Sequence, residues 1–513
     1  MIDPRSWSLG VLSGMSRRGF LASSVAALVV GQVRAQEAAA EPSLLEFAKQ
    51  LRDQLYVPPS GDLPPPFAGL DYNAFRAIRT MRGHSSFLPL GDDYAYDLLP
   101  PGLYFPDPVT VEAPEAEGFA AVPFSPRMFE FDARYFASVP QEAPGAGFSG
   151  LRVRHPLNDS TVMDEFLVVQ GGSYFRAIGR AMVYGLSARA VALGTGGPEP
   201  EEFPRFTHLR LRKPSEGRAR LEAVIDSASL TGHMALETEP GDETRLSVTV
   251  TLFPRREIAD VGIGALTSMY LKGPLRNAVS DDFRPAVHDT DVLVIENGAG
   301  EILWRPLSNP ARVEISAFGD VDPRGFGLYQ TDRDFDDFED AEARYHDRPS
   351  ARVEPRGDWG AGAVMLVEIP TGDEFMDNMV AFWRPEAVLA AGSEHTFSYD
   401  IVWTRQPPAQ PGPAQIIGAR AGRVHDRPGA LRYVVDFDHH PPESVTDLTA
   451  SNGAEIDGIA SVALPDGRHR VTFVLLPNDA DAVELRLVLR TAEGMPASAV
   501  WLHRWTPARD GGV

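Results

Sequence analysis

The sequence predicts an all-β protein, and two observations support this. Apolar and polar residues alternate along short segments such as 246–252 and 313–317, which is the period of a strand with one buried face. Proline and glycine, with 44 and 46 residues, separate these segments at short intervals. Short strands with frequent turns are typical of β-sandwiches, whereas βαβ units would alternate strands with helices.

Length and composition limit the classes of protein that fit. A chain of 513 residues predicts two or three domains, and a hydrophobic fraction of 43% is enough to build their cores. The formal net charge of −23 would repel phosphate backbones, so nucleic acid is excluded as an expected partner. Cysteine is absent, which excludes disulfides, thiolate nucleophiles and cysteine-bound metals.

The first 35 residues are predicted to be a signal peptide. Residues 16–21 read SRRGFL, which is the twin-arginine pattern, and a short apolar segment of small residues follows at 21–30. Val-Arg-Ala at 33–35 is a cleavage site before Gln36. We therefore expect a periplasmic protein exported by the twin-arginine route; either Met1 or Met15 can be its start.

One amphipathic helix is expected before the strands begin. Leu44, Phe47, Ala48, Leu51 and Leu55 follow the i, i+3, i+4, i+7 spacing. Prolines then end the helical pattern. Farther along, the continuous apolar run at 364–369 predicts a strand that is buried on both faces.

A proline-rich segment divides the chain into two predicted domains. Residues 404–415 contain four prolines and no apolar period, which is typical of a linker. We therefore expect an N-terminal domain at 36–403 and a C-terminal domain at 416–513. Several short strands in roughly 100 residues suit an immunoglobulin-like sandwich for the smaller domain.

Familiar cofactor and metal motifs are absent from the sequence. It contains no Walker A loop, no strand-associated G-x-G-x-x-G and no H-E-x-x-H. Residues 185–189 lack the second glycine of a nucleophile elbow. In the acidic run that starts at Asp332, Asp337 and Ala343 replace the glycine and glutamate that a calcium loop needs. The prediction is that neither a metal nor an organic cofactor is required.

Three clusters of carboxylates lie among arginines and aromatic residues, at 281–291, 332–348 and 374–378. Separated carboxylates suit glycoside chemistry, in which one acid protonates the leaving oxygen and one base activates water. Aromatic rings offer flat apolar faces to sugars. Acidic runs also occur on solvated faces, and Trp304, Trp359, Trp383 and Trp403 equally suit a core. These patterns indicate a carbohydrate-active or carbohydrate-binding protein.

Ten segments resemble sequence blocks of the periplasmic glucan biosynthesis protein family (MdoG/OpgG–OpgD). They occur in the family's order between about residue 40 and the C-terminus. The segments are 172–177, 183–189, 266–270, 284–289, 304–307, 325–328, 348–350, 353–355, 357–360 and 377–378. The twin-arginine pattern is more like the OpgD branch. Residues 203–206 continue into Thr-His-Leu-Arg, which departs from the family's aromatic, acidic stretch and leaves the preferred glucan length open.

The resemblance implies a large N-terminal β-sandwich similar to galactose mutarotase and a smaller immunoglobulin-like C-terminal one. It also implies inverting action on a β-1,2-glucan backbone, by hydrolysis or by transglycosylation. The family's general acid matches Asp377 and its general base matches Asp289. The other residues expected to bind substrate are His288, Tyr345, Arg348, Asp358, Trp359 and Glu374.

Some alternatives stay open at the level of sequence. The chain can be a non-catalytic glucan-binding accessory protein that works beside a membrane glucosyltransferase, with both acids acting only as sugar ligands. Hydrolysis and ring closure differ in which acceptor reaches the anomeric carbon, and residue patterns do not report this. Assembly as a homodimer is likewise left open.

The mature chain is expected to begin at Gln36, and its export is expected to require both Arg17 and Arg18. N-terminal sequencing of periplasmic material tests the first expectation. Replacing the two arginines by lysines should abolish export, because the translocase reads the pair. An intact Met1 or Met15 in the periplasm, or normal export of the Lys-Lys variant, would contradict this prediction.

Overall fold

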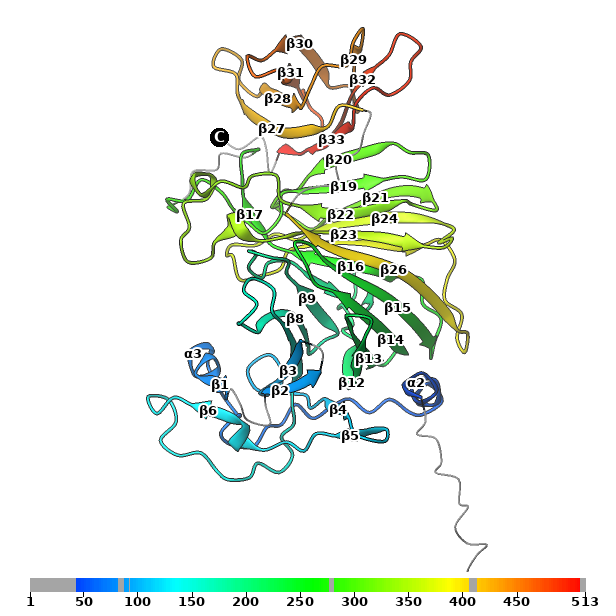
Figure 1. Cartoon of the computed structure of the whole chain (residues 1–513). Helices are drawn as coiled ribbons and strands as arrows, with labels where there is room; N and C mark the ends of the chain where they lie inside the picture. Colours follow the sequence, from blue (N-terminus) through cyan, green and yellow to red (C-terminus); the bar gives the residue numbers. More distant parts are fainter. Residues whose placement is uncertain (1–42, 82–86, 92, 276–280, 406–412, 508–513) are drawn as a thin grey trace, which may run out of the picture. The chain divides into compact units, whose positions relative to one another are not determined.

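Strands dominate the structure, a computed structural model that describes residues 43–81, 87–91, 93–275, 281–405 and 413–507. Two large sheets and one smaller sheet contain most of the strands (Figure 1). The all-β prediction is therefore confirmed. The predicted signal peptide lies outside the described residues. Within the described part of the chain, none of the helices has the length and apolarity that a membrane span requires.

The first sheet has eleven strands, and nearly all of its neighbours pair antiparallel. In spatial order its strands are β2 (Phe87–Gly91), β3 (Tyr94–Leu99), β7 (Gly150–His155), β8 (Asp164–Gln170), β9 (Tyr174–Ala177), β10 (Ser187–Arg189), β16 (Val261–Ser268), β25 (Met379–Pro385), β24 (Ala361–Glu368) and β21 (Glu314–Val321), with β11 (Ala192–Leu193) paired to β16.

The second sheet has fourteen strands and includes the longest strands of the fold. In spatial order they are β5 (Phe119–Ala121), β4 (Thr110–Pro114), β12 (Arg205–Ser215), β13 (Arg218–Asp226), β14 (Leu230–Glu239), β15 (Thr244–Pro254), β26 (His395–Thr404), β23 (Ser350–Arg356), β22 (Gly325–Tyr329), β19 (Val292–Glu296), β20 (Ile302–Pro306), β33 (Val500–Trp505), β32 (Val483–Arg490) and β29 (Val445–Ala450).

The main core lies between these two sheets. On β15, Leu246, Val248, Val250 and Leu252 are all fully buried, and they alternate with more exposed serine and threonine residues, as the sequence predicts. They belong to one apolar cluster together with residues of the first sheet, such as Leu151. The run predicted to be buried on both faces is confirmed, because residues 364–367 of β24 are almost completely inaccessible.

The predicted amphipathic helix is present as α2 (Leu44–Arg52), which lies against the outer face of the second sheet (Figure 1). Its Ala48 is fully buried, and the Ala48 carbonyl accepts a hydrogen bond of 2.7 Å from the Thr231 hydroxyl on β14. The expectation that the helix includes Leu55 is wrong. The helix ends at Arg52, and Leu55 is 91% exposed, because the chain leaves the sheet surface before the prolines.

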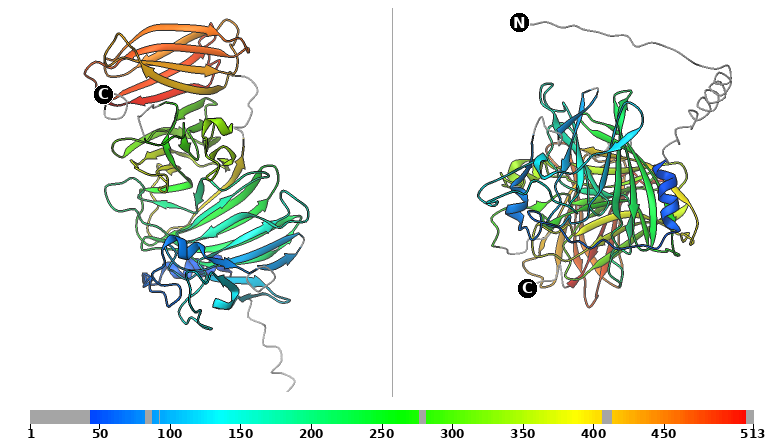
Figure 2. Two further views of the ribbon diagram at one scale, coloured as in Figure 1. Left: turned by 90° about the vertical axis from the view of Figure 1, so that its left-hand side faces the viewer. Right: turned by 90° about the horizontal axis from the view of Figure 1, so that it is seen from below.

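The C-terminal strands form a second sandwich, visible edge-on in Figure 2. Its four-stranded sheet consists of β27 (Ile416–Arg423), β28 (Leu431–Phe437), β31 (His469–Leu476) and β30 (Glu455–Ala463), and β29, β32 and β33 face it. Four facing three strands agrees with the immunoglobulin-like expectation. The domain boundaries stay a prediction, and residues 406–412 of the predicted linker lie outside the described residues.

The smaller sandwich is continuous with the larger one. β33 pairs parallel with β20, so that Leu303 lies opposite Val500 and Trp304 lies opposite Trp501. The apolar core of the C-terminal strands includes Trp304 and other residues of β19, β20 and β22. Among the described residues, two short strand pairs and five short helices complete the fold. They are β1 (Ile78–Thr80) with β6 (Phe129–Phe131), β17 (Tyr270–Lys272) with β18 (Val287–His288), α2, α3 (Tyr72–Arg76), η1 (Pro126–Met128), η2 (Phe335–Asp337) and η3 (Tyr345–Asp347).

Trp501→Ala is expected to lower the free energy of unfolding by about 3–5 kcal/mol, because the fully buried indole would leave a cavity in the shared core. Val462→Ala on the exposed face of β30 is the control and should change it by less than about 0.5 kcal/mol. Urea titration followed by circular dichroism measures both. Equal effects of the two substitutions would contradict the shared core.

Candidate active site

Three segments from distant parts of the sequence meet at one end of the strands. The first is the end of β18, with His288 and Asp289. The second is the turn from η3 into β23, with Tyr345 and Arg348. The third is the loop before β25, which carries Asp377. The resemblance predicts site residues on all three segments, and hydrogen bonds and electrostatic interactions connect these segments.

Asn378 fixes the loop before β25 to its neighbours. Its amide oxygen accepts a hydrogen bond of 2.8 Å from the Tyr270 backbone N–H, and its amide nitrogen donates to the carbonyls of Tyr270 and Ile369. The side chain is fully buried. The position of Asp377, one residue earlier, is therefore set by three hydrogen bonds to strand β17 and to the end of β24.

Asp289 is a nearly buried carboxylate, 3% exposed, that forms an ion pair with Arg348. Its backbone N–H donates to the Met269 carbonyl at 2.8 Å, which fixes the start of the segment after β18. The Arg348 guanidinium also lies over the Tyr345 ring, 4.3 Å from its centre. Arg348 thus supplies the positive charge that a buried carboxylate needs and links Asp289 to Tyr345.

His288 is fully buried and cannot contact a substrate directly. Its ring stacks on Tyr270 with centroids 5.3 Å apart, and its Nδ1 lies 2.6 Å from the Gln330 side-chain oxygen. Burial lowers the pKa of His288 to about 4, so the ring is neutral at pH 7. With Nδ1 donating to Gln330, the position of the His288 ring is fixed next to Asp289 in the sequence.

Glu374 lies at the centre of a second polar network. Its carboxylate accepts hydrogen bonds of 2.7 Å from the Tyr345 hydroxyl and from Arg284, and Arg284 also pairs with Asp340 at 2.6 Å. Burial and the bond to Glu374 raise the pKa of Tyr345, so its hydroxyl stays protonated. A pocket of about 720 Å³ adjoins this network and is lined by Glu374, Arg284 and the exposed Phe375, among others.

Asp377 differs from the other carboxylates of the site. Surrounding protein raises its pKa to about 6, and the charge of Asp289 adds to this effect, while Arg176, Arg189 and Arg348 oppose it. The side chain is nevertheless exposed. Both observations fit a carboxyl on a concave surface, which water reaches from one side only. Asp289 and Asp377 therefore lie close enough to influence each other.

Two of the carboxylates in the loop before β25, Glu374 and Asp377, have different roles. The carboxylate whose charge helps to raise the pKa of Asp377 is Asp289, and the sequence neighbour Glu374 is not among the main causes of the shift. Arg284 and the Tyr345 hydroxyl already bind Glu374, so its charge is balanced within its own network.

Asp358 and Trp359 lie apart from the other predicted site residues. They precede β24, whose first residues pair with the far end of β25, whereas Asp377 precedes the near end. The seven residues of β25 span roughly 20 Å. Trp359 packs in the main core against Trp383 and Tyr399, and Asp358 is exposed. The expectation that these two residues bind substrate beside the others is not supported by this geometry.

Sequence patterns missed two residues that hold the site together. Gln330 binds His288 through its side-chain oxygen and donates from its amide nitrogen to the Tyr345 carbonyl at 2.7 Å. Arg284 lies within a predicted cluster, but only the fold shows that it bridges Glu374 and Asp340. No group of three or more potential metal ligands occurs within the part of the chain that the structure describes.

Asp377→Asn should stabilise the protein at high pH relative to the parent chain. The folded protein holds the Asp377 proton up to about pH 6, whereas the unfolded chain releases it near pH 4. Between these values the folded state binds more protons, so the parent loses stability as pH rises. The Tm difference between variant and parent should therefore grow from about pH 4 to about pH 7. Asp358→Asn is the exposed control; the same trend in both variants would contradict the assignment.

Comparison with known proteins identifies the family. The family model described as "Periplasmic glucan biosynthesis protein, MdoG" matches residues 41–505. "Glucans biosynthesis protein G" of Vibrio cholerae is 39% identical over 90% of this chain and 86% of its own length. The protein of the same name from Shewanella frigidimarina is 37% identical over 90% and 84%.

A solved structure, a galactose mutarotase related enzyme from Lactobacillus acidophilus, aligns with a TM-score of 0.21 and 11% identity over 50% of this chain and 91% of its own. Both relatives above carry the name "Glucans biosynthesis protein G", whereas the signal pattern is more like the OpgD branch. The branch of the family therefore stays a prediction. The match over most of the length and the two relatives lead to one conclusion: this chain belongs to the periplasmic glucan biosynthesis protein family.

Proposed function

We propose that this protein cleaves or transfers a β-1,2-glucan chain with inversion, with Asp377 as general acid and Asp289 as general base. The observation that carries the proposal is the contrast between the two neighbouring carboxyls. Asp377 is exposed and has a pKa raised to about 6, while Asp289 is buried against Arg348. A carboxyl whose surroundings favour its protonated form suits the acid, and a carboxylate in an ion pair with an arginine suits the base.

In the proposed step, Asp377 gives its proton to the glycosidic oxygen as the bond from that oxygen to the anomeric carbon breaks. An acceptor hydroxyl, from water or from a sugar, attacks the anomeric carbon from the opposite face and loses its proton toward Asp289. Water as acceptor gives hydrolysis, and a sugar hydroxyl gives transglycosylation. The exposed Phe375 beside the adjoining pocket offers an apolar face to a sugar ring.

The burial of Asp289 favours an indirect path for the second proton. Only 3% of this residue is exposed, and Arg348 occupies one of its oxygens. A relay through a water molecule or through a substrate hydroxyl would connect the attacking group to Asp289. The separation of the two carboxyls is then expected to be at least about 6.5–9.5 Å.

Membership of a periplasmic glucan biosynthesis family places the role of this protein in the periplasm. Export by the twin-arginine route, association with a membrane glucosyltransferase and assembly as a homodimer are further proposals. The first is supported by residues 16–21, and the second follows from the resemblance alone.

The alternative is a non-catalytic glucan-binding protein of the biosynthetic machinery. The ion pair between Asp289 and Arg348 favours it, since a carboxylate held in this way can be a fixed hydrogen-bond acceptor for a sugar. The two proposals differ in one measurement, the release of reducing ends from linear β-1,2-glucan. Mass spectrometry of the products then separates hydrolysis from ring closure.

Asp377→Asn and Asp289→Asn should each lower turnover of linear β-1,2-glucan by a factor of about 10² or more, with glucan binding retained. With an activated aryl leaving group, which needs no proton, the Asp377 variant should recover most of its rate and the Asp289 variant should not. Asp358→Asn is the matched control and should keep full turnover. Near-normal turnover of either active-site variant would contradict the assignment.

A further inference from the structure

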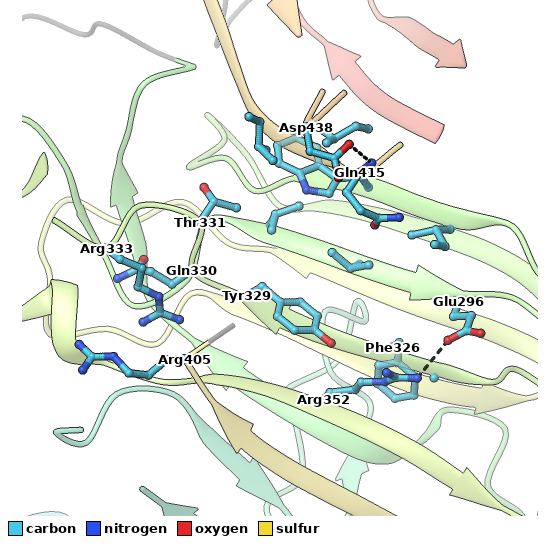
Figure 3. Close-up of a pocket in the computed structure, with 17 residues that line it drawn as sticks. Glu296, Phe326, Tyr329, Gln330, Thr331, Arg333, Arg352, Arg405, Gln415 and Asp438 are labelled. Atoms are coloured by element: carbon cyan, nitrogen blue, oxygen red, sulfur yellow. Dashed lines mark hydrogen bonds and ion pairs between the residues drawn. The ribbon is translucent and has the colours of Figure 1, made fainter. Parts of the chain in front are cut away.

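A second pocket, of about 480 Å³, lies between the edge of the large sandwich and the start of the C-terminal strands (Figure 3). Strands β19, β20, β22 and β23 supply one wall, and residues 415–417 with Asp438 supply the other. Its volume is that of a small-molecule site. None of the predicted site residues lines it.

Most of the pocket wall is apolar. Val294, Ile302, Trp304 and Phe326 line it from the large sandwich, and Ile417 lines it from the C-terminal side. Trp304 is mostly buried in the core that the two sandwiches share, whereas Ile417 is 37% exposed. A flat or branched apolar group of modest size would therefore be desolvated on both sides.

Two arginines, Arg333 and Arg405, lie at one end of the pocket (Figure 3). Arg333 donates to the Arg348 carbonyl and, at 2.9 Å, to the Ser350 hydroxyl, while its Nε has no hydrogen-bond partner among the described residues. No carboxylate of the described chain forms an ion pair with it. Arg405 binds Asp347 through one terminal nitrogen at 2.6 Å, and its other terminal nitrogen donates to the Ala181 carbonyl at 3.4 Å. Asp347 also pairs with Arg344, so the ion pairs at this end of the pocket leave positive charge in excess.

The pocket's own carboxylates do not balance that charge. Glu296 pairs with Arg352 at 3.0 Å, and Asp438 accepts a hydrogen bond of 2.9 Å from the Gln415 backbone N–H. In Figure 3, both carboxylates lie apart from Arg333 and Arg405. Buried guanidinium groups are stabilised by planar anions that accept two parallel hydrogen bonds, and a carboxylate has this geometry.

We propose that this pocket is a binding site for a small organic carboxylate with an apolar body, separate from the proposed glucan site. The carboxylate binds Arg333 and Arg405, and the apolar body packs between Trp304, Phe326 and Ile417. Gln330 and Thr331, which also line the cationic end, offer further polar contacts.

The position of the pocket connects it to the candidate active site. Gln330 forms part of the pocket wall and binds both His288 and the Tyr345 carbonyl. Arg333 binds the carbonyl of Arg348, whose side chain holds Asp289. A carboxylate bound to Arg333 would therefore contact the side chain that donates to the Arg348 carbonyl, and Arg348 is the ion-pair partner of Asp289.

The test uses 2-naphthoate as the probe and isothermal titration calorimetry of the full mature chain as the readout. The probe should bind with one-to-one stoichiometry, and the neutral 2-naphthamide should bind at least about tenfold more weakly. Arg405→Met and Ile417→Glu should each weaken 2-naphthoate binding by about tenfold or more, the first by removing a cation and the second by adding a negative charge.

Arg427→Met is the matched control, because Arg427 also forms a carboxylate pair of 2.6 Å, with Asp457, on the exposed surface of the C-terminal strands. It should leave binding unchanged, as should Asp377→Asn. No binding at millimolar probe, equal affinity for the amide, or unchanged affinity in the folded Arg405 and Ile417 variants would each overturn the proposal. Because binding is measured without turnover, an inactive glucan assay does not affect this result.

Discussion

Arginine pairing makes it possible for this acidic chain to bury carboxylates. Asp97 is fully buried between Arg152 and Arg154, Glu368 is fully buried against Arg305, and the nearly buried Asp436 pairs with Arg470. A buried carboxylate without such a partner would lose its hydration with no compensation. The same rule governs the candidate site, where Arg348 balances Asp289 and Arg284 balances Glu374.

Asp377 is a carboxyl of the candidate site that this rule leaves out. Asp377 forms no ion pair within the described residues. The surrounding protein and the nearby charge of Asp289 both disfavour its ionised form, so they raise its pKa and favour protonation. A solvent-accessible acid with a pKa of about 6 keeps part of its population protonated near neutral pH, and a glycosidic oxygen needs such a proton donor. The chemistry that we propose thus follows from where arginines are present and where they are missing.

The sequence predicted what depends on local periodicity. The alternation of 246–252 is found as expected, and so is the double-sided burial of 364–368, because these segments pair in the interior of their sheets; Ile369, after the end of β24, is only half-buried. The alternating segment 313–317 is confirmed as a strand, β21, but the face that its apolar pattern predicts to be buried is wrong. Ile315 is 46% exposed while Glu314 is buried, because β21 lies at the edge of the first sheet and its apolar face stays uncovered.

The candidate site was predictable only in part. Asp289 and Asp377 lie far apart in the sequence, and no spacing rule connects them. Both were predicted from the family resemblance alone. The roles of Gln330 and Arg284 depend on contacts between loops that only the fold establishes. Trp359 illustrates the opposite case, since an aromatic residue beside an aspartate suggests sugar binding, yet its ring fills the core between Trp383 and Tyr399.

The parallel pairing of β33 with β20 has a consequence for truncated chains. β20 lies inside the second sheet only because the last strand of the chain covers it. A chain that lacked the C-terminal strands would leave the backbone groups of β20 that face β33 unpaired, because β19 pairs with the other edge of β20 only, and Trp304 and Ile302 would be uncovered beside them. Such an edge can pair with another copy of itself. The C-terminal strands therefore protect the large sandwich against aggregation.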